Sequence, residues 1–241
     1  PAARCPPPMH RIPLPLLLAI LGFAGLAQPA SARPPLDKPN VIVIFLDDSG
    51  YGDYEHTGNP VIQTPNIARL AAQGANFTQF YVASSACSAS RYALMTGRYP
   101  SRSQLGGWVI GPESKQHLRP QETTLAEGLK QAGYRTAMFG KWHLGNPNPE
   151  NGMTAGSLPL AHGFESWIGT NVSHDYGNAL LLKSDPAGKD PIPEYATLAR
   201  KLPANPAVCE SLTGQYTEGV VAFIEANKDR PFFAYVAHNQ P

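Results

Sequence analysis

The stretch NVIVIFLDDSG, residues 40–50, decides the fold class. Residues 40–46 form a continuous, β-branched run, and this pattern is typical of a strand that is buried on both faces, as in a parallel sheet. The run ends abruptly in two aspartates, a serine and a glycine, which favour a turn. The stretch therefore predicts a strand of an α/β fold with polar side chains at its carboxyl end.

Helix and strand patterns alternate after this strand. TPNIARLAAQG, residues 64–74, predicts a short helix, because Pro65 suits a first turn and Gly74 can end the helix. NFTQFYV, residues 76–82, alternates like a strand. Residues 88–95 again have a helical pattern, and the Thr-Gly pair that follows is expected to end this helix.

The second half of the chain continues the alternation with one long interruption. Thr124 and Glu127 have the spacing of a capping box, which predicts that a helix begins there. Gly133 can end this helix, and residues 134–140 follow as a strand. Residues 147–210 are rich in Pro, Gly and Asn and predict long loops with short elements. The pattern then predicts a helix whose apolar face consists of Tyr216, Val220, Phe223 and Ile224. A buried strand follows at PFFAYVA, residues 231–237.

This alternation indicates an α/β fold with a mostly parallel central sheet and helices on both faces. No internal repeat is visible. The chain stops at Pro241, just after a strand, so we expect a substantial C-terminal part of the fold to lie beyond that residue.

The N-terminal residues have the features of a signal peptide. Met9 is the natural start of translation, which would place residues 1–8 upstream of the protein. Two basic residues after Met9 precede an apolar run at residues 14–27. An Ala-Ser-Ala cleavage site ends at Ala32, and the run is shorter than the roughly 20 residues of a membrane span. We expect residues 1–32 to be removed from an exported, periplasmic or secreted protein, with an uncleaved anchor as the alternative. Residues 33–39 form a Pro-rich linker to residues 40–241.

Composition excludes several classes of function. The net charge is +1 and no basic run is present, so we expect neither nucleic-acid binding nor stable membrane association. After loss of Cys5 with the leader, Cys87 and Cys209 remain, and a disulfide between them is one possible state. No CxxC pair suggests zinc.

Asp47 and Asp48 are the first candidate site residues. Two adjacent carboxylates at the end of a buried strand repel each other and lose solvation unless a cation compensates them. Their hard oxygens favour calcium or magnesium. The alternative is a solvated turn, because Asp-Asp-Ser-Gly is also ordinary turn chemistry.

Two further segments place reactive side chains where elements meet. Cys87 would lie at the positive end of the helix over 88–95, with Arg91 one turn further on. Lys141 and His143 follow a strand and suit a bound anion and proton transfer. The alternatives are a small buried cysteine beside a surface arginine, and a solvated lysine beside a core histidine.

Together these residues describe an oxyanion site. A cation held by aspartates, flanking Arg and Lys side chains and a nucleophile at a helix N-terminus suit a tetrahedral anion such as sulfate or phosphate. The chemistry of the residues leaves both anions open. Ligands collect at the carboxyl ends of strands in α/β sheets, which favours one shared site.

The motifs resemble those of the type I sulfatases. CSASRYALMTGR, from residue 87, resembles the family's first signature, and GYRTAMFGKWHLG, residues 133–145, is similar to its second. PNVIVIFLDDSGYGD resembles the metal strand, while HGFESWIGTNVSHDYGN and RPFFAYVA resemble the arylsulfatase A and N-acetylgalactosamine-6-sulfatase branch. The resemblance covers residues 39–241.

The resemblance implies an alkaline-phosphatase-like α/β fold and hydrolysis of sulfated small molecules or sulfated carbohydrates. It also implies that a sulfatase-maturing enzyme oxidises Cys87 to Cα-formylglycine, whose hydrate attacks sulfur. Arg91, Lys141 and calcium (or magnesium) would then polarise the ester, and His143 would help to release sulfate. Asp47, Asp48 and the residue at position 87 would be metal ligands, and Ser173 would contact the sulfate group.

Some features depart from the family pattern or remain open. Ala89 replaces the commoner Pro, and the family's second metal pair, second Lys and leaving-group acid are expected beyond Pro241, so that this chain alone is expected to be inactive. His238 lies too early for the acid. Asn76 and Asn171 begin glycosylation sequons, which we interpret as structural or site residues. The rival hypotheses are a phosphate or phosphonate ester hydrolase of the same superfamily and a catalytically silent anion-binding homologue.

Overall fold

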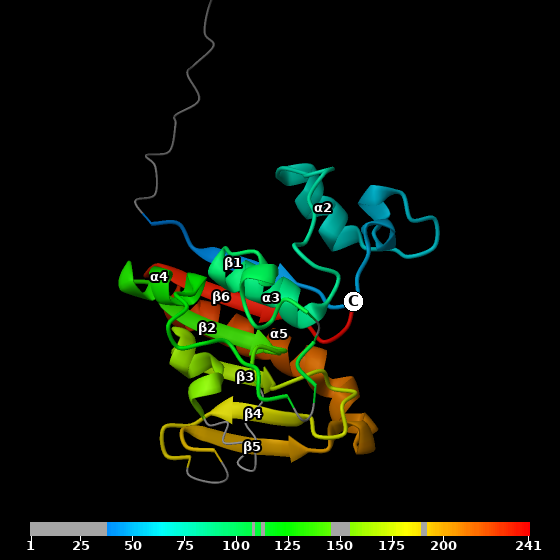
Figure 1. The fold of residues 1–241 in the computed structure, drawn as a ribbon. Helices are drawn as coiled ribbons and strands as arrows, with labels where there is room; N and C mark the ends of the chain where they lie inside the picture. Colours follow the sequence, from blue (N-terminus) through cyan, green and yellow to red (C-terminus); the bar gives the residue numbers. More distant parts are fainter. Residues whose placement is uncertain (1–37, 108, 112–113, 146–154, 189–191) are drawn as a thin grey trace, which may run out of the picture. The chain divides into compact units, whose positions relative to one another are not determined.

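A mixed sheet forms the centre of the computed structural model, which describes residues 38–107, 109–111, 114–145, 155–188 and 192–241 (Figure 1). The expected signal peptide and most of the linker lie outside these residues and stay predictions. Residues 38–241 form one compact unit by their contacts. In spatial order the strands of the described residues are β1 (Val41–Phe45), β6 (Phe232–Ala237), β2 (Arg135–Gly140), β3 (Ser166–Thr170), β4 (Leu180–Ser184) and β5 (Tyr195–Arg200).

The sheet is mostly parallel, as predicted. β1 pairs with β6, β6 with β2 and β2 with β3 in parallel, whereas β4 and β5 add two antiparallel pairs at one side. β6 is the last strand in the chain but lies between β1 and β2, and all six of its residues are buried. Central placement explains the continuous apolar pattern of PFFAYVA.

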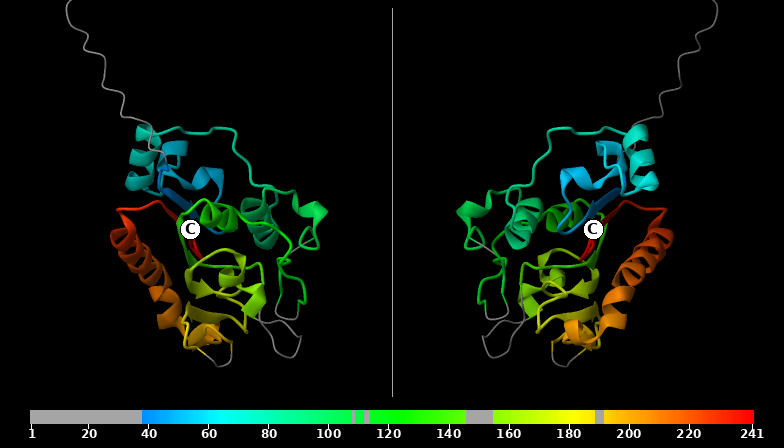
Figure 2. Two further views of the ribbon diagram at one scale, coloured as in Figure 1. Left: turned by 90° about the vertical axis from the view of Figure 1, so that its left-hand side faces the viewer. Right: turned by 90° about the vertical axis from the view of Figure 1, so that its right-hand side faces the viewer.

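Helices lie on both faces of the sheet, which confirms the α/β class. α3 (Cys87–Thr96) and α4 (Leu125–Gln131) lie on one face, and α5 (Pro206–Asn227) lies on the other (Figures 1 and 2). The predicted capping box begins α4, because Thr124 Oγ1 accepts from Glu127 N at 3.0 Å and Glu127 Oε2 accepts from Thr124 N at 2.7 Å. None of the helices over the described residues has the length and apolar character that a membrane crossing requires.

Short 3₁₀ turns and one further helix complete the described elements. The helix is α2 (Pro65–Gln73), and the 3₁₀ turns are η2 (Tyr51–Asp53), η3 (Glu55–Thr57), η4 (Pro100–Arg102), η6 (Ala155–Ser157), η7 (Pro159–His162) and η8 (Leu202–Ala204).

Stacked aromatic rings tie the segment after β2 to the central strand. The Phe164 ring stacks on Phe233 and Tyr235 with centroids 5.9 and 6.3 Å away, and Trp142 meets Phe164 edge-on at 6.3 Å. All four side chains are buried. This core fixes Trp142, and therefore the residues on either side of it, relative to β6.

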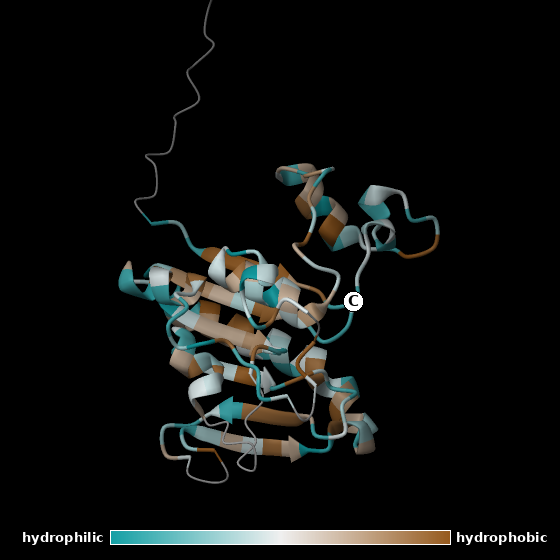
Figure 3. Ribbon diagram, viewed as in Figure 1, coloured by the Kyte–Doolittle hydropathy of each residue, from teal (hydrophilic) through white to brown (hydrophobic). Residues whose placement is uncertain are grey.

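The prediction that β1 is buried on both faces is wrong. Ile42 and Ile44 are 47% and 60% exposed, while Val41, Val43 and Phe45 pack against the core. β1 is one of the two edge strands of the described sheet, and the face that carries Ile42 and Ile44 is open to solvent; Figure 3 shows the apolar colouring of the strand. A continuous apolar run in the sequence does not show whether neighbouring elements cover one face of the strand or both.

The strand predicted over residues 76–82 is also wrong. The segment has no strand structure, and Phe77, Phe80, Tyr81 and Val82 are all more than half exposed. Alternation predicts a strand only when another strand is available for pairing, and the described residues offer none here. The α2 helix before it was predicted correctly, although none of its residues is buried.

Residues 147–210 contain short elements between loops, as predicted, but the sequence did not show that three of these elements are strands of the central sheet. β3, β4 and β5 all fall in this range, and α5 begins at Pro206. The β4–β5 pairing shifts register between Leu181 and Leu182, so a clean period of two is lost there. Strands of five or six residues with an irregular register leave a weak signal in the sequence.

Candidate active site

The carboxyl ends of the parallel strands meet at one edge of the sheet, and the segment after β2 is held there by backbone hydrogen bonds. Lys141 N donates to Ala237 O at 2.8 Å, and His143 N donates to Asn171 O at 3.0 Å. Trp142 N donates to Thr170 O at 2.9 Å between these two. The Lys-Trp-His segment is therefore fixed between the end of β6 and the end of β3.

Gly140 allows this close approach. Its φ is +110°, and a Cβ atom built on it would lie 1.8 Å from the carbonyl oxygen of Ala237. Only glycine can occupy such a position, because any side chain would collide with the neighbouring backbone. The glycine therefore sets the position of Lys141, the next residue.

A buried ion-pair cluster forms where β1, α3 and β2 meet. Arg91 Nη2 donates to Asp47 Oδ1 at 2.9 Å, and Lys141 Nζ donates to Asp47 Oδ2. Burial alone would raise the pKa of the Asp47 carboxyl, but the charges and hydrogen bonds of Arg91 and Lys141 hold it below its ordinary value. Two cations face one carboxylate, so the cluster carries excess positive charge and suits an anion.

Arg91 is held rigidly inside the cluster. Its Nη1 donates to Lys141 O at 3.0 Å, and its guanidinium carbon lies 5.2 Å from the centroid of the Phe45 ring. The side chain is fully buried, and its Nε has no hydrogen-bond partner within the described residues. A buried donor of this kind favours an acceptor from a bound group.

Cys87 is the first residue of α3, as predicted. The residues that follow it, 88–91, are buried, while Cys87 itself is half-buried. Ser88 Oγ accepts from Ile110 N at 2.9 Å, which fastens the start of the helix to the loop at Ile110. The positive end of the helix dipole favours negative charge at position 87, and Arg91 lies one turn further along the same helix.

His143 is a buried, neutral histidine. Its Nε2 lies 2.9 Å from the carbonyl oxygen of Ile110, so Nε2 carries the proton and Nδ1 is left as an acceptor. Burial and then the charge of Lys141 lower the pKa of His143 to about 3. Within the part of the chain that the structure describes, Nδ1 is buried without a partner.

The family model for sulfatases matches residues 39–241 of the chain. The chain belongs to the sulfatase family. Human arylsulfatase A is 41% identical over 238 residues, which cover 93% of this chain and 44% of that protein. Mouse N-acetylgalactosamine-6-sulfatase is 35% identical over 239 residues, which cover 92% of this chain and 42% of that protein. The chain thus spans less than half the length of these two curated relatives.

Solved structures confirm the predicted sulfatase fold, which is of the alkaline-phosphatase-like type. A structure from work on glycosaminoglycan metabolism by Bacteroides thetaiotaomicron has a TM-score of 0.67 and 26% identity, and covers 84% of this chain and 51% of that chain. The structure of Ps i-CgsB in complex with k-i-k-neocarrahexaose has a TM-score of 0.63 and 28% identity, and covers 85% and 45%.

In this sulfatase-family chain, the structure brings together predicted site residues from the metal strand, from the two signatures and from the segment that contains Ser173. Asp47, Arg91 and Lys141 form direct contacts, and Lys141 Nζ also donates to Ser173 Oγ at 3.2 Å. The alternatives with a surface arginine, a solvated lysine or a solvated Asp47 are wrong, because all three side chains are buried. The disulfide alternative is wrong as well, because both Cys87 and Cys209 are free.

Asp48 and His238 do not join the ion-pair cluster. Asp48 is exposed and has a φ of +53°, which turns the chain away from β1. The ring of His238 lies 6.2 Å from that of Tyr216 on α5, while its backbone N donates to Phe45 O. This placement agrees with leaving His238 out of the predicted catalytic set.

The described residues provide part of a site for a hard cation. Asp47 and Asp48 have the right donor chemistry, but calcium takes six to eight oxygen ligands. No group of three or more His, Cys, Asp or Glu side chains that could hold a metal occurs in the described ranges. A cation at this edge therefore requires oxygen ligands from elsewhere, in addition to these two carboxylates.

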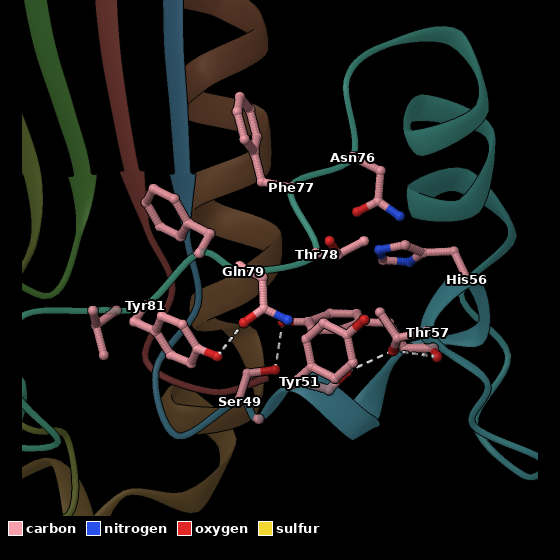
Figure 4. A pocket seen from close by; sticks show the side chains of 13 residues that line it. Ser49, Tyr51, His56, Thr57, Asn76, Phe77, Thr78, Gln79 and Tyr81 are labelled. Carbon is pink, nitrogen blue, oxygen red and sulfur yellow. Dashed lines mark hydrogen bonds between the residues drawn. The ribbon is translucent and has the colours of Figure 1, made fainter.

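A separate open pocket of about 660 Å³ begins directly after Asp48. Figure 4 shows its lining from the turns after β1 and from the segment at 76–82, with Tyr51, His56, Phe77 and Tyr81 among the labelled side chains. None of the predicted catalytic residues lines it. This pocket is therefore distinct from the cluster of predicted site residues.

Proposed function

We propose that the protein hydrolyses sulfate esters at the cluster formed by Asp47, Arg91 and Lys141, with position 87 as the nucleophile. The observation that supports this most directly is the buried excess of positive charge beside the start of α3. The negatively charged sulfate group of an ester compensates buried cations, and fixed donors stabilise it without reorganisation.

Arg91 and Lys141 would hold the sulfate group. Arg91 is fixed by Asp47 and by the carbonyl of Lys141, so its remaining Nε–H is already oriented for an acceptor. Lys141 Nζ lies between Asp47 and Ser173, and Ser173 Oγ is a further donor for a sulfate oxygen. Because these side chains are ordered before binding, little entropy is lost when the anion arrives.

His143 would accept the proton during release of sulfate. Its Nδ1 is the unprotonated nitrogen, because Nε2 donates to Ile110 O. Burial lowers the pKa of His143, and the charge of Lys141 lowers it further. A bound sulfate would offset the charge of Lys141. Substrate binding therefore raises the basicity of His143 toward the range that proton transfer needs.

Two groups complete the proposed chemistry. Cα-formylglycine, made from Cys87 by a sulfatase-maturing enzyme, supplies an aldehyde hydrate as nucleophile. Asp47, Asp48 and position 87 would hold calcium or magnesium, which supplies Lewis acidity toward the ester.

The substrate class follows from the relatives. Their names include N-acetylgalactosamine-6-sulfatase and arylsulfatase A, and one solved structure contains a neocarrahexaose. We propose a sulfated carbohydrate or a sulfated small molecule. The proposed export depends on residues 9–32, which lie outside the described residues.

The test is turnover of an aryl sulfate by the full-length gene product, co-expressed with a maturing enzyme, together with the mass of the Cys87 peptide. Cys87→Ala and Cys87→Ser should abolish turnover while circular dichroism stays unchanged. Retained turnover in either variant would refute the proposed nucleophile. Faster hydrolysis of the phosphate ester of the same phenol would favour the phosphatase alternative, and an unmodified Cys87 peptide with no turnover would favour the silent homologue.

A further inference from the structure

The connection between β3 and β4 carries a tyrosine beside the ion-pair cluster that sequence analysis did not single out. Tyr176 N donates to Ser173 O at 3.1 Å, and Ala179 N donates to Tyr176 O at 2.9 Å. Ser173 in turn contacts Lys141 through its hydroxyl. Two consecutive turns therefore hold Tyr176 at a fixed position three residues after a side chain of the cluster.

The ring of Tyr176 is supported from one side by His143. The two ring centroids are 5.6 Å apart and the planes cross at 79°, which is an edge-on contact. His143 is fully buried, whereas Tyr176 is half-buried. One part of the phenol ring therefore rests on the site, and the other part faces solvent.

The hydroxyl of Tyr176 lies within electrostatic reach of the reacting groups. Burial raises the pKa of this hydroxyl, and the charges of Cys87, Asp175, Asp47 and Asp48 raise it further. The phenol therefore stays protonated at neutral pH and can donate a hydrogen bond.

The remaining groups of the cluster can contact only the anion. Arg91, Lys141 and His143 are at most 1% exposed, so the organic part of an ester cannot pack on them. That part must extend outward past the half-buried side chains, which at this cluster include Cys87, Ser173 and Tyr176. Tyr176 is the aromatic side chain of these three.

We propose that Tyr176 is a specificity-determining residue. Its ring forms a wall against which a ring in the organic part of the ester packs, and its hydroxyl donates a hydrogen bond to an oxygen of that part. The inference rests on the proposed function and narrows the substrate class to sulfate esters of cyclic alcohols. A sugar ring offers a face of C–H groups and a phenol offers an aromatic face, so either can pack on a tyrosine ring, and the experiment distinguishes them.

The test measures binding rather than turnover, in the full-length gene product with Cys87→Ala and calcium present. Isothermal titration would use p-nitrophenyl sulfate, glucosamine 6-sulfate and inorganic sulfate as probes. Adding Tyr176→Ala should weaken binding of at least one ring ester by roughly tenfold and leave inorganic sulfate unchanged. Tyr176→Phe should restore p-nitrophenyl sulfate binding but not glucosamine 6-sulfate binding if a sugar oxygen accepts from the hydroxyl.

The control variant is Tyr99→Ala, which removes a tyrosine that is 71% exposed and outside the cluster. It should change none of the three affinities. Equal weakening of all three probes by Tyr176→Ala would show that Tyr176 supports the anion site, and unchanged ring-ester binding would show no contact; either result overturns the inference. Absence of sulfate-ester turnover in the wild type would refute the proposed function instead, because these binding measurements do not depend on turnover.

Discussion

At the scale of single residues, Asp47 links the chemistry of the site to its stability. Its two carboxylate oxygens accept from Arg91 and Lys141, and all three side chains are buried. A buried ion pair contributes little net stability, but removal of one partner leaves an uncompensated charge in the interior. Asp47 is therefore a structural residue as well as a proposed metal ligand.

We predict that Asp47→Ala destabilises the protein by about 3–5 kcal/mol, because two buried cations would remain without a carboxylate. The measurement is urea unfolding in the presence of a chelator, which removes any contribution of bound metal. Glu225→Ala is the control, since the pair of Glu225 and Lys228 is exposed and should contribute less than about 1 kcal/mol. An equal, small loss for both variants would contradict the cluster's role.

Most of the site could be predicted at this scale. Each of the pairs Cys87–Arg91 and Lys141–His143 lies within one short motif, so its spacing was visible in the sequence. Tyr176 was missed because it acts from a connection whose path depends on the pairing of β3 with β4. The sequence also could not show that Arg91 and Lys141 compensate Asp47, because these contacts join residues far apart in the chain.

At the scale of elements, close backbone packing constrains the end of β2. Gly140 has a φ of +110° and faces the backbone of Ala237 without room for a side chain. The next residue, Lys141, donates to the same carbonyl oxygen. A shift of this strand end would therefore move the lysine away from Asp47.

We predict that Gly140→Ala costs at least about 3 kcal/mol, from steric overlap and from the strained φ together. Gly128→Ala is a matched control, because Gly128 lies within α4 and has open space around its Cα. That substitution should stabilise the helix by about 0.5–1 kcal/mol. Changes of opposite sign in the thermal unfolding temperatures of the two variants would support this account of β2, and an unchanged unfolding temperature for Gly140→Ala would refute it.

Element prediction succeeded where local chemistry decides the outcome. The capping box at Thr124, the helix after Cys87 and the central strand at 232–237 all follow from short patterns. It failed at 76–82 and for β3 to β5, where pairing with distant segments decides between strand and loop. A register shift and short strands removed the remaining signal.

At the scale of the whole molecule, buried neutral histidines make folding sensitive to acid. His162 is fully buried and stacks on Trp142 at 5.7 Å. Burial and then the charge of His117 lower the pKa of His162 to about 4. The folded state therefore disfavours the protonated form that the unfolded chain adopts below about pH 6.5.

We predict that stability is full above about pH 6.5 and is lost as the pH falls toward 4, with a slope of up to about 1.4 kcal/mol per pH unit from His162. His162→Phe keeps a ring against Trp142 but removes the titrating group. Denaturant unfolding between pH 4 and 7 should therefore show a flatter pH dependence for this variant. An unchanged slope would mean that His162 does not contribute.

The position of β6 has a consequence for the order of events during synthesis. The ribosome makes this strand last among the described strands, yet it separates β1 from β2 and supplies the Tyr235 and Ala237 contacts of the site. Until residues 232–237 emerge, the sheet has a gap at its centre, Arg91 lacks its contact with Tyr235 and Lys141 lacks its contact with Ala237. A modifying enzyme of the proposed kind would therefore reach the thiol at position 87 before the contacts of the ion-pair cluster are complete.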